Sequence, residues 1–151
     1  MQFSHPDSEL VEQPIGYWSW AAHTSVVAHI RQALATVGLT QPQWWVLNQL
    51  DDAAGAHSLE GLIRTLRGYL DVGDQLNVDI DDLVARGVIV VDDMDQVAMT
   101  PEGQRILAAA KEVQITAHTR IHGGVTDDDL LTTMKVLQRM IHNTDGKFWH
   151  H

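Results

Sequence analysis

The stretch DVGDQLNVDIDDLVARGVIVVDDMDQVAMT, residues 71–100, carries two hydrophobic periodicities in succession, and together they restrict the fold more than any other feature of the chain. Its first half predicts a helix whose buried stripe is formed by Leu76, Ile80, Leu83 and Val84, with Gly87 as the residue that ends it. VIVV and VAM then flank the short polar segment DDMDQ, which predicts a tight β-hairpin over residues 88–99.

The segments before this stretch predict three more helices. Residues 14–38 contain no helix breaker after Gly16 and should form a long helix that ends at Gly38. Thr40 is a suitable N-cap for the next helix, with Pro42 in its first turn. Ser58 can cap a third helix with an apolar edge.

After the hairpin, two further helices are expected. Thr100 is a suitable N-cap with Pro101 at the first helical position, and this helix should run to about His122. Thr126 can cap the last helix, which carries apolar residues on one side. The order is four helices, a hairpin and two helices, so we predict a mainly α, winged helix-turn-helix fold with long terminal helices. The whole chain, residues 1–151, should form one domain.

Composition excludes several classes of protein. The chain has 44% hydrophobic residues, enough for a real core, and no cysteine, which rules out disulfides and thiolate metal sites. Its formal charge of −10 opposes non-specific attraction to nucleic acid or anionic lipid. The amino terminus lacks the features of a secretory signal, and no segment approaches the about 18 consecutive apolar residues of a membrane helix. We therefore expect a cytoplasmic protein with no membrane partner and no cofactor.

Four segments resemble the MarR family of winged-helix transcriptional regulators: IGYWSWAA, GLTQPQWWVLNQL, LVARGVI and MTPEGQRIL. The resemblance covers residues 10–143. It implies a homodimer formed through helices in residues 10–38 and 101–143, and a winged helix-turn-helix lobe over residues 39–100 with its wing at 88–99. It also implies control of transcription, with DNA binding that responds to a small molecule held between the dimerisation helices and the lobe.

The resemblance implies that the helix over residues 72–86 enters the major groove of DNA. This helix and its N-cap carry acidic residues, which we expect it to present: Asp71, Asp74, Asp79, Asp81 and Asp82. The wing tip at residues 92–96 has no basic residue, and Arg86 lies at the far end of the helix. Carboxylates repel phosphates, so we expect weak or atypical DNA contact. The same carboxylates could instead form a solvated face. The predicted DNA-binding residues are Arg64, Arg67, Gln75 and Asn77.

Aromatic residues suggest a ligand pocket. Trp45 follows the Trp44 position that we assign to core packing, and it could face a cavity between helices. Trp18 and Trp20 lie about 200° apart on one helix, so at least one should leave the core and face a partner chain or the pocket. Indole rings suit a flat aromatic ligand. The predicted ligand-binding residues are Trp18, Trp20, His23, Trp45 and His118.

Histidines leave two further possibilities. His23 could act as an acid or base if it lined a closed pocket, and it is the candidate catalytic residue if the protein is an enzyme. His118 and His122 are spaced by one helical turn, a spacing that can chelate zinc. No remaining metal ligands are evident in the sequence, since Glu9, Glu12 or His23 would have to supply them, and a surface or structural role accounts for these histidines more simply.

Three functions follow from these observations. The first is a homodimeric regulator that responds to a small, aromatic ligand and contacts DNA weakly. The second is a winged-helix scaffold without DNA binding that serves as a small-molecule-binding protein or an enzyme with a Trp- and His-lined pocket. The third is an acidic module that binds a basic protein surface or mimics DNA. We favour the first and do not expect catalysis.

Overall fold

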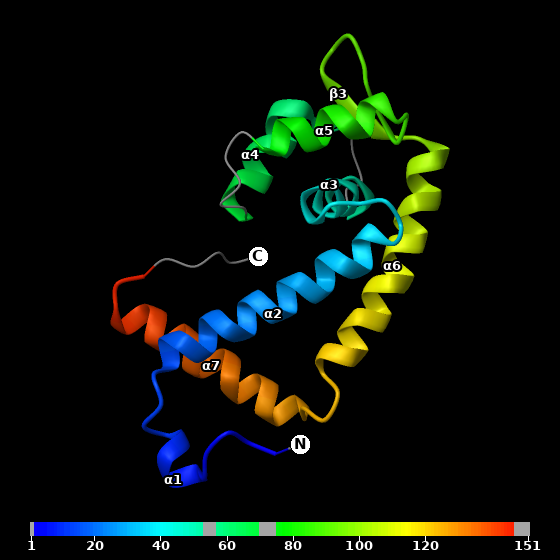
Figure 1. Cartoon of the computed structure of the whole chain (residues 1–151). Coiled ribbons are helices and arrows are strands. Elements are labelled where there is room, and N and C mark those ends of the chain that lie inside the picture. The colour runs from blue at the N-terminus through cyan, green and yellow to red at the C-terminus, as the bar shows by residue number, and fades with distance from the viewer. Residues whose placement is uncertain (1, 53–56, 70–74, 147–151) are drawn as a thin grey trace.

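The computed structural model describes residues 2–52, 57–69 and 75–146 of the chain. The helices are α1 (Asp7–Leu10), α2 (Ile15–Ala35), α3 (Gln41–Asp52), α4 (Leu59–Tyr69), α5 (Gln75–Ala85), α6 (Pro101–Ile121) and α7 (Asp127–Asn143), and the strands are β1 (His57–Ser58), β2 (Ile89–Val91) and β3 (Gln96–Met99). The predicted mainly α, winged helix-turn-helix fold is confirmed. Figure 1 shows α3, α4, α5 and the hairpin at one end of the molecule and α7 at the other.

The predicted caps are confirmed wherever they lie in the described residues. The Thr100 hydroxyl accepts a hydrogen bond from the Gly103 amide, and Pro101 is the first residue of α6. Thr126 and Asp129 form a reciprocal capping box at the start of α7. Asp71, the predicted cap of α5, lies outside the described residues. These local hydrogen bonds satisfy the free amides of the first helical turn. Because they involve neighbouring residues, the starts of these helices could be predicted from the sequence.

Two elements were not predicted. The short helix α1 precedes α2, and β1 adds a third strand, so the sheet order is β1-β3-β2 with both pairs antiparallel. His57 faces Val97 across the β1–β3 pair, and Val90 faces Ala98 across the β2–β3 pair. A strand of two residues carries too little periodic signal to be found in a sequence.

The hydrophobic core lies in the winged-helix lobe and reaches only the adjoining ends of α2 and α6. Its fully buried members include Leu34, Leu47, Leu76, Leu83 and Ile89. Val84, which was predicted to be buried, is 40% exposed, so that part of the predicted stripe is wrong. The helix buries Leu76, Ile80 and Leu83 against α3 and turns Val84 outward.

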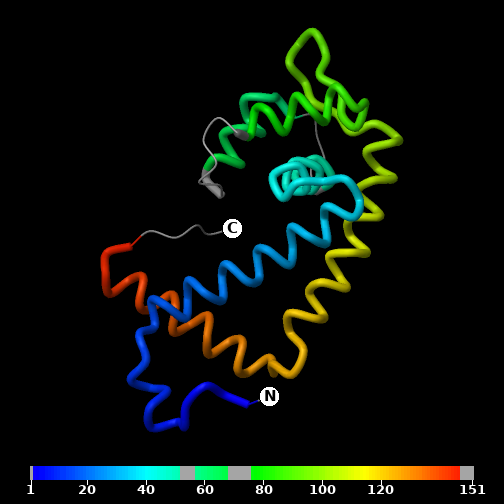
Figure 2. Tube along the Cα trace, in the orientation of Figure 1, coloured from blue at the N-terminus to red at the C-terminus, as the bar shows by residue number. Residues whose placement is uncertain are grey.

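The terminal helices lack a core of their own. No residue in the ranges 2–33 and 118–146 is buried. Helix α7 makes few contacts with the rest of the described chain, whereas α2 packs mainly against α6. Figure 2 shows that α2 and α6 approach each other near the lobe and diverge away from it. Among the described residues, none of the helices combines the length and the apolarity needed to cross a bilayer.

Candidate functional site

Helix α5 is the element that would read DNA in a winged helix, and its exposed face is short of cations. Asn77, Val78 and Asp81 are exposed along it, and Val78 is 59% exposed. Gln75 is the first residue of the helix, but its side chain lies outside the described part of the structure. The described face therefore offers an amide, an apolar side chain and a carboxylate to a partner.

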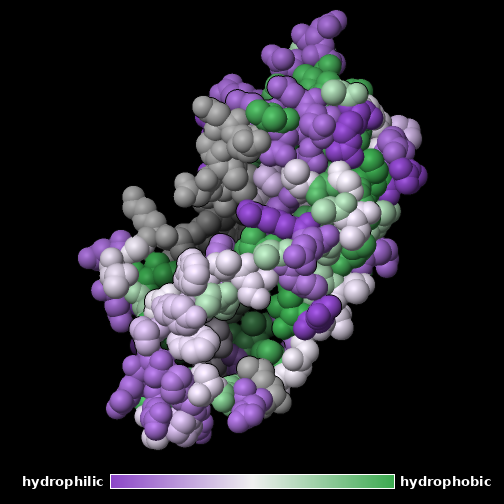
Figure 3. Space-filling view, in the orientation of Figure 1, coloured by the Kyte–Doolittle hydropathy of each residue, from purple (hydrophilic) through white to green (hydrophobic). Residues whose placement is uncertain are grey.

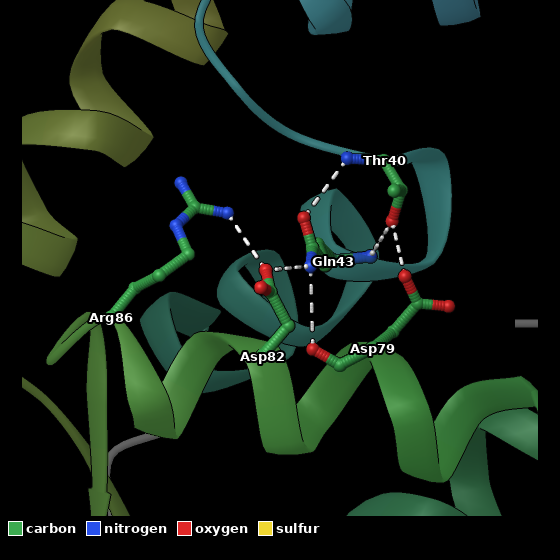
Figure 4. Close-up of polar contacts among 5 residues, drawn as sticks. All are labelled: Thr40, Gln43, Asp79, Asp82 and Arg86. Atoms are coloured by element: carbon green, nitrogen blue, oxygen red, sulfur yellow. Dashed lines mark hydrogen bonds and ion pairs between the residues drawn. The ribbon is translucent and has the colours of Figure 1, made fainter.

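Asp79 does not belong to this face, which corrects the predicted set of presented acidic residues. Its side chain is buried, and Thr40 donates a hydrogen bond from Oγ1 to Oδ1 of Asp79 at 2.7 Å (Figure 4). The Thr40 hydroxyl also accepts from the Gln43 amide at 3.2 Å, so one side chain both caps α3 and fastens α5. Burying a carboxylate is tolerated because it is hydrogen-bonded.

Gln43 completes this connection between α3 and α5. Its buried side chain accepts from the Thr40 amide at 3.0 Å and donates both to the Asp79 carbonyl and, at 2.8 Å, to Oδ2 of Asp82. We call the five residues drawn in Figure 4 the latch: Thr40, Gln43, Asp79, Asp82 and Arg86. The latch fixes the orientation of α5 by side-chain bonds that the hydrophobic core alone does not provide.

Arg86 closes the latch at the end of α5. Its guanidinium donates to Oδ2 of Asp82 at 2.9 Å, one helical turn away. This hydrogen bond, and after it the one from Gln43, lowers the pKa of Asp82 below its ordinary value. The only basic residue of the 71–96 stretch is thus engaged by a carboxylate of the same helix.

The wing also uses an aspartate structurally. Oδ1 of Asp92 accepts hydrogen bonds from the Met94 amide at 2.9 Å and the Gln96 amide at 2.8 Å. Asp95 has a φ of 56°, a left-handed conformation that aspartate tolerates better than most residues. Both features build the tight turn. Much of the acidity of this stretch therefore has a local structural cause.

The lobe nevertheless remains strongly negative. Residues 39–100 contain eleven Asp and Glu residues but only three Arg residues. Arg64 and Arg67 are both exposed on α4, and Arg64 has no hydrogen bond or ion pair within the described residues. The predicted DNA-binding residues Arg64, Arg67 and Asn77 are thus accessible, and they supply little positive charge.

A cavity of about 370 Å³ lies between α2 and α6, where the two helices begin to diverge. Figure 3 shows hydrophobic residues gathered at the hollow between them. Its apolar wall includes Ala33, Val113 and Ala117, and its polar groups come from His29, Thr36, Glu112, Thr116 and Arg120. Arg120 is exposed and has no ion pair within the described residues. The cavity could hold a small apolar molecule with an acidic group.

The five predicted ligand-binding residues do not line this cavity. Trp18 lies on the same face of α2 as His29, eleven residues before it, but it is not among the residues that line the cavity. Trp20 is 62% exposed, and both tryptophans contact Tyr17, at ring-centroid distances of 5.4 Å for Trp18 and 6.1 Å for Trp20.

Trp45, His23 and His118 lie elsewhere. Trp45 is half-buried against the core of the lobe. His23 is exposed, and its ring has no hydrogen bond within the described residues. Helical geometry places His118 on the face of α6 opposite the cavity. Sequence reasoning missed His29, Thr36 and Arg120, although the spacing of Trp18, His29 and Thr36 was a usable signal.

His118 and His122 do lie together, with ring centroids 3.8 Å apart. However, within the described residues no group of three or more His, Asp or Glu side chains is placed to hold a metal ion. Two histidines alone make an incomplete zinc site.

The lowered pKa of Asp82 predicts how the latch depends on pH. Its carboxylate stabilises the fold above the ordinary pKa, and this contribution is lost as the pH falls through the lowered value. Replacing Arg86 with methionine should therefore lower the free energy of unfolding at pH 7, and the difference from the native chain should shrink as the pH falls from 7 to below 3.8, the ordinary aspartate pKa. Urea unfolding of both proteins across this range measures it. If the two proteins differ in unfolding free energy by the same amount at both ends of the pH range, Arg86 stabilises the fold by packing alone.

No protein-family model and no curated protein matches the sequence. Solved structures do match the fold. The regulator BpsR of Bordetella bronchiseptica, whose DNA binding is regulated by 6-hydroxynicotinic acid, has a TM-score of 0.69 at 22% identity, with 92% of this chain and 99% of that one covered. CouR of Rhodococcus jostii, solved with p-coumaroyl-CoA, has a TM-score of 0.67 at 26% identity, covering 85% and 92%. The MarR family protein Rv2887 of Mycobacterium tuberculosis, solved with DNA, has a TM-score of 0.65 at 20% identity, covering 85% and 98%. The chain therefore has a MarR-like winged-helix fold.

Proposed function

We propose that the chain is a homodimeric transcriptional regulator of the MarR type that binds a small aromatic acid and contacts DNA weakly. The observation that carries this proposal is the uneven distribution of the core. The winged-helix lobe is packed around buried residues, whereas the terminal helices around it have none over residues 2–33 and 118–146. Such a chain needs a partner for its terminal helices, and a second copy supplies matching helices.

The exposed side chains of the terminal helices support this arrangement. Large apolar residues are exposed on α2, α6 and α7: Ile15, Tyr17, Trp18, Trp20, Ile115, Leu131, Met134, Val136 and Met140. Exposed apolar surface on several adjacent helices is typical of an interaction site. Residues 10–38 and 101–143 are accordingly the proposed dimerisation region, and residues 39–100 are the proposed DNA-binding lobe, with the wing at 88–99.

The DNA contact depends on α4 as much as on α5. Arg64 has no competing ion pair in the described residues, whereas Arg86 is held by Asp82. The two arginines on α4 of each subunit provide a small positively charged surface for the DNA phosphates. Asn77, together with Gln75 at the start of α5, can form hydrogen bonds with the edges of the bases. The carboxylates of Asp81 and the wing keep the affinity low.

Replacing Arg64 with alanine should weaken DNA binding about tenfold and reduce the slope of log affinity against log salt by about 2 in the dimer. Fluorescence anisotropy with DNA that flanks the protein's own gene measures both quantities. Arg139→Ala on α7 removes the same charge from the other end of the chain and should change neither. Equal binding by the Arg64→Ala and native proteins would place the DNA contact elsewhere.

For the ligand, the cavity between α2 and α6 is the proposed site. Arg120 would pair with a carboxylate, and the apolar wall would contact an aromatic ring. A second copy covering the open side would exclude water and strengthen this pair. The two ligand-associated structures of similar fold involve 6-hydroxynicotinic acid and p-coumaroyl-CoA; both compounds carry an aromatic ring, and the first also carries a carboxylate.

Calorimetric titration with 6-hydroxynicotinic acid and with p-coumarate tests this site. Arg120→Met should weaken binding of whichever acid is bound by about tenfold, because it removes a charge-assisted hydrogen bond of roughly 1.5–3 kcal/mol. Lys135→Met on α7 is the matched control. The site is wrongly assigned if Arg120→Met binds the acid as tightly as the native protein.

A further inference from the structure

A second hollow lies on the lobe, on the side of the wing, and the proposed regulator mechanism does not use it. This wing groove has a volume of about 850 Å³ and is bounded by the end of α3, the three-stranded sheet and the first turns of α6. The side chains that matter for its chemistry are Asp51, His57, Val90, Asp92, Met94 and Ala98. The hairpin that forms it projects from the end of the molecule in Figure 1.

The floor of the wing groove is apolar and uncovered. Val90 and Ala98 face each other across the β2–β3 pair, and both are exposed, Val90 by 51%. Met94 at the hairpin tip is 76% exposed. These side chains point away from the core, since the neighbouring Ile89 and Val97 are buried on the other face of the sheet. Because these side chains are turned toward solvent, the packing of the core does not require them to be apolar.

The rim of the wing groove is negative. Asp92 uses Oδ1 to accept the Met94 and Gln96 amides, while Oδ2 has no hydrogen bond or ion pair within the described residues. Asp93 and Asp95 are exposed in the same turn. Asp51 pairs with Lys111 at 2.5 Å, and no Lys or Arg is among the described lining residues. Carboxylates around an apolar floor attract a cation that also carries apolar groups and repel a phosphate backbone.

His57 adds a polar group that has no intramolecular role. Its Nε2 is buried and is the one buried side-chain nitrogen or oxygen without a hydrogen-bond partner in the described residues. An unpartnered buried polar atom costs stability, and such atoms are rare in folded proteins. His57 is one of the residues that line the wing groove, and its pairing with Val97 places its side chain on the face of the sheet opposite Val90 and Ala98.

We propose that the wing groove docks an extended segment of another protein in which apolar residues alternate with lysine or arginine. The apolar side chains would cover Val90 and Met94, and the cations would meet Asp92, Asp93 and Asp95. A peptide fits better than a small molecule, because a half-exposed sheet face cannot enclose the surface of a compact ligand. This inference does not rest on the dimer or on the ligand cavity, but Asp92, Asp93 and Asp95 belong to the wing of the proposed DNA-binding lobe.

The test uses the full chain and fluorescein-labelled peptides. KLKLKLKL should bind with a micromolar Kd at low salt, whereas ELELELEL should not bind and KSKSKSKS should bind at least tenfold more weakly. Val90→Lys and Met94→Lys should each weaken KLKLKLKL binding at least tenfold. Val78→Lys, which adds the same charge at a similarly exposed valine on α5, should not.

A second pair of changes keeps the test independent of any disturbance of the sheet. Asp93→Asn together with Asp95→Asn removes two charges at exposed positions without adding bulk, and it should weaken KLKLKLKL binding severalfold at low salt but little at high salt. Equal binding of KLKLKLKL and KSKSKSKS, or unchanged binding by Val90→Lys, would overturn the proposal. If the Val90→Lys protein lost its self-association, the wing groove would be an interface between two copies of this chain. That result would also overturn the proposal of a peptide partner.

Discussion

Replacing Gly103 with alanine should lower the free energy of unfolding by about 3 kcal/mol. A Cβ at this position would lie 2.2 Å from the Val88 carbonyl oxygen and 2.5 Å from Cγ of Met99. The first of these is a backbone atom that cannot rotate away, so α6 would have to separate from the wing. Alanine is the better helix former by about 1 kcal/mol, but this gain is smaller than the cost of the overlap.

Gly16→Ala is the matched control, because it makes the same change near the start of another long helix. Apart from its chain neighbours and the backbone of its own helix, no atom lies within 4 Å of a Cβ built there, so the variant should be neutral or stabilised by up to about 1 kcal/mol. Urea unfolding of both variants at neutral pH measures the effect. If the Gly103→Ala and Gly16→Ala variants have similar free energies of unfolding, α6 does not lie close enough to the wing at Gly103 to exclude a methyl group.

Met134→Asp should raise the Kd of the dimer at least 100-fold. Met134 is 49% exposed on α7, next to the half-buried stripe of Leu130, Leu137 and Ile141. In the proposed dimer this position is covered by the partner, so each subunit would bury an unpaired carboxylate, at a cost of several kcal/mol. Sedimentation velocity over a range of concentrations measures the change.

Thr132→Asp provides the control for this experiment, since Thr132 lies on the side of α7 opposite Met134. It should leave the dimer intact. If Met134→Asp is as dimeric as Thr132→Asp, the face of α7 that carries Met134 is not part of the interface. A native chain that is monomeric at micromolar concentration would contradict the dimer altogether.

The fold could be predicted from the sequence because its decisive signals are local. Thr100, Thr126 and Gly87 act within one helical turn of their own position, and their roles follow from residue type and spacing. The hairpin was found for the same reason. The strand β1 was not, because its two residues gain their strand character only by pairing with β3.

The candidate site was harder to predict because its features depend on contacts between distant segments. Nothing near Asp79 in the sequence shows that it meets Thr40, which precedes it by 39 residues, so it was grouped with the exposed aspartates. Likewise, the cavity between α2 and α6 follows from the angle at which the two helices cross. Composition identified the negative charge of the lobe but could not separate the aspartates that build the latch and the wing turn from those that face a partner.

The central claim is that a dimer with few available cations contacts DNA weakly through its lobes, and a salt titration of DNA binding tests it most directly. With Arg64 and Arg67 from each of two subunits, the slope of log affinity against log salt should be about −2 to −4 for DNA flanking the protein's own gene. If the protein does not bind this DNA even at low salt, the proposal that it is a transcriptional regulator is contradicted. If the slope of log affinity against log salt is near −10, many more cations contact the DNA than proposed, and the claim of a weak contact is contradicted.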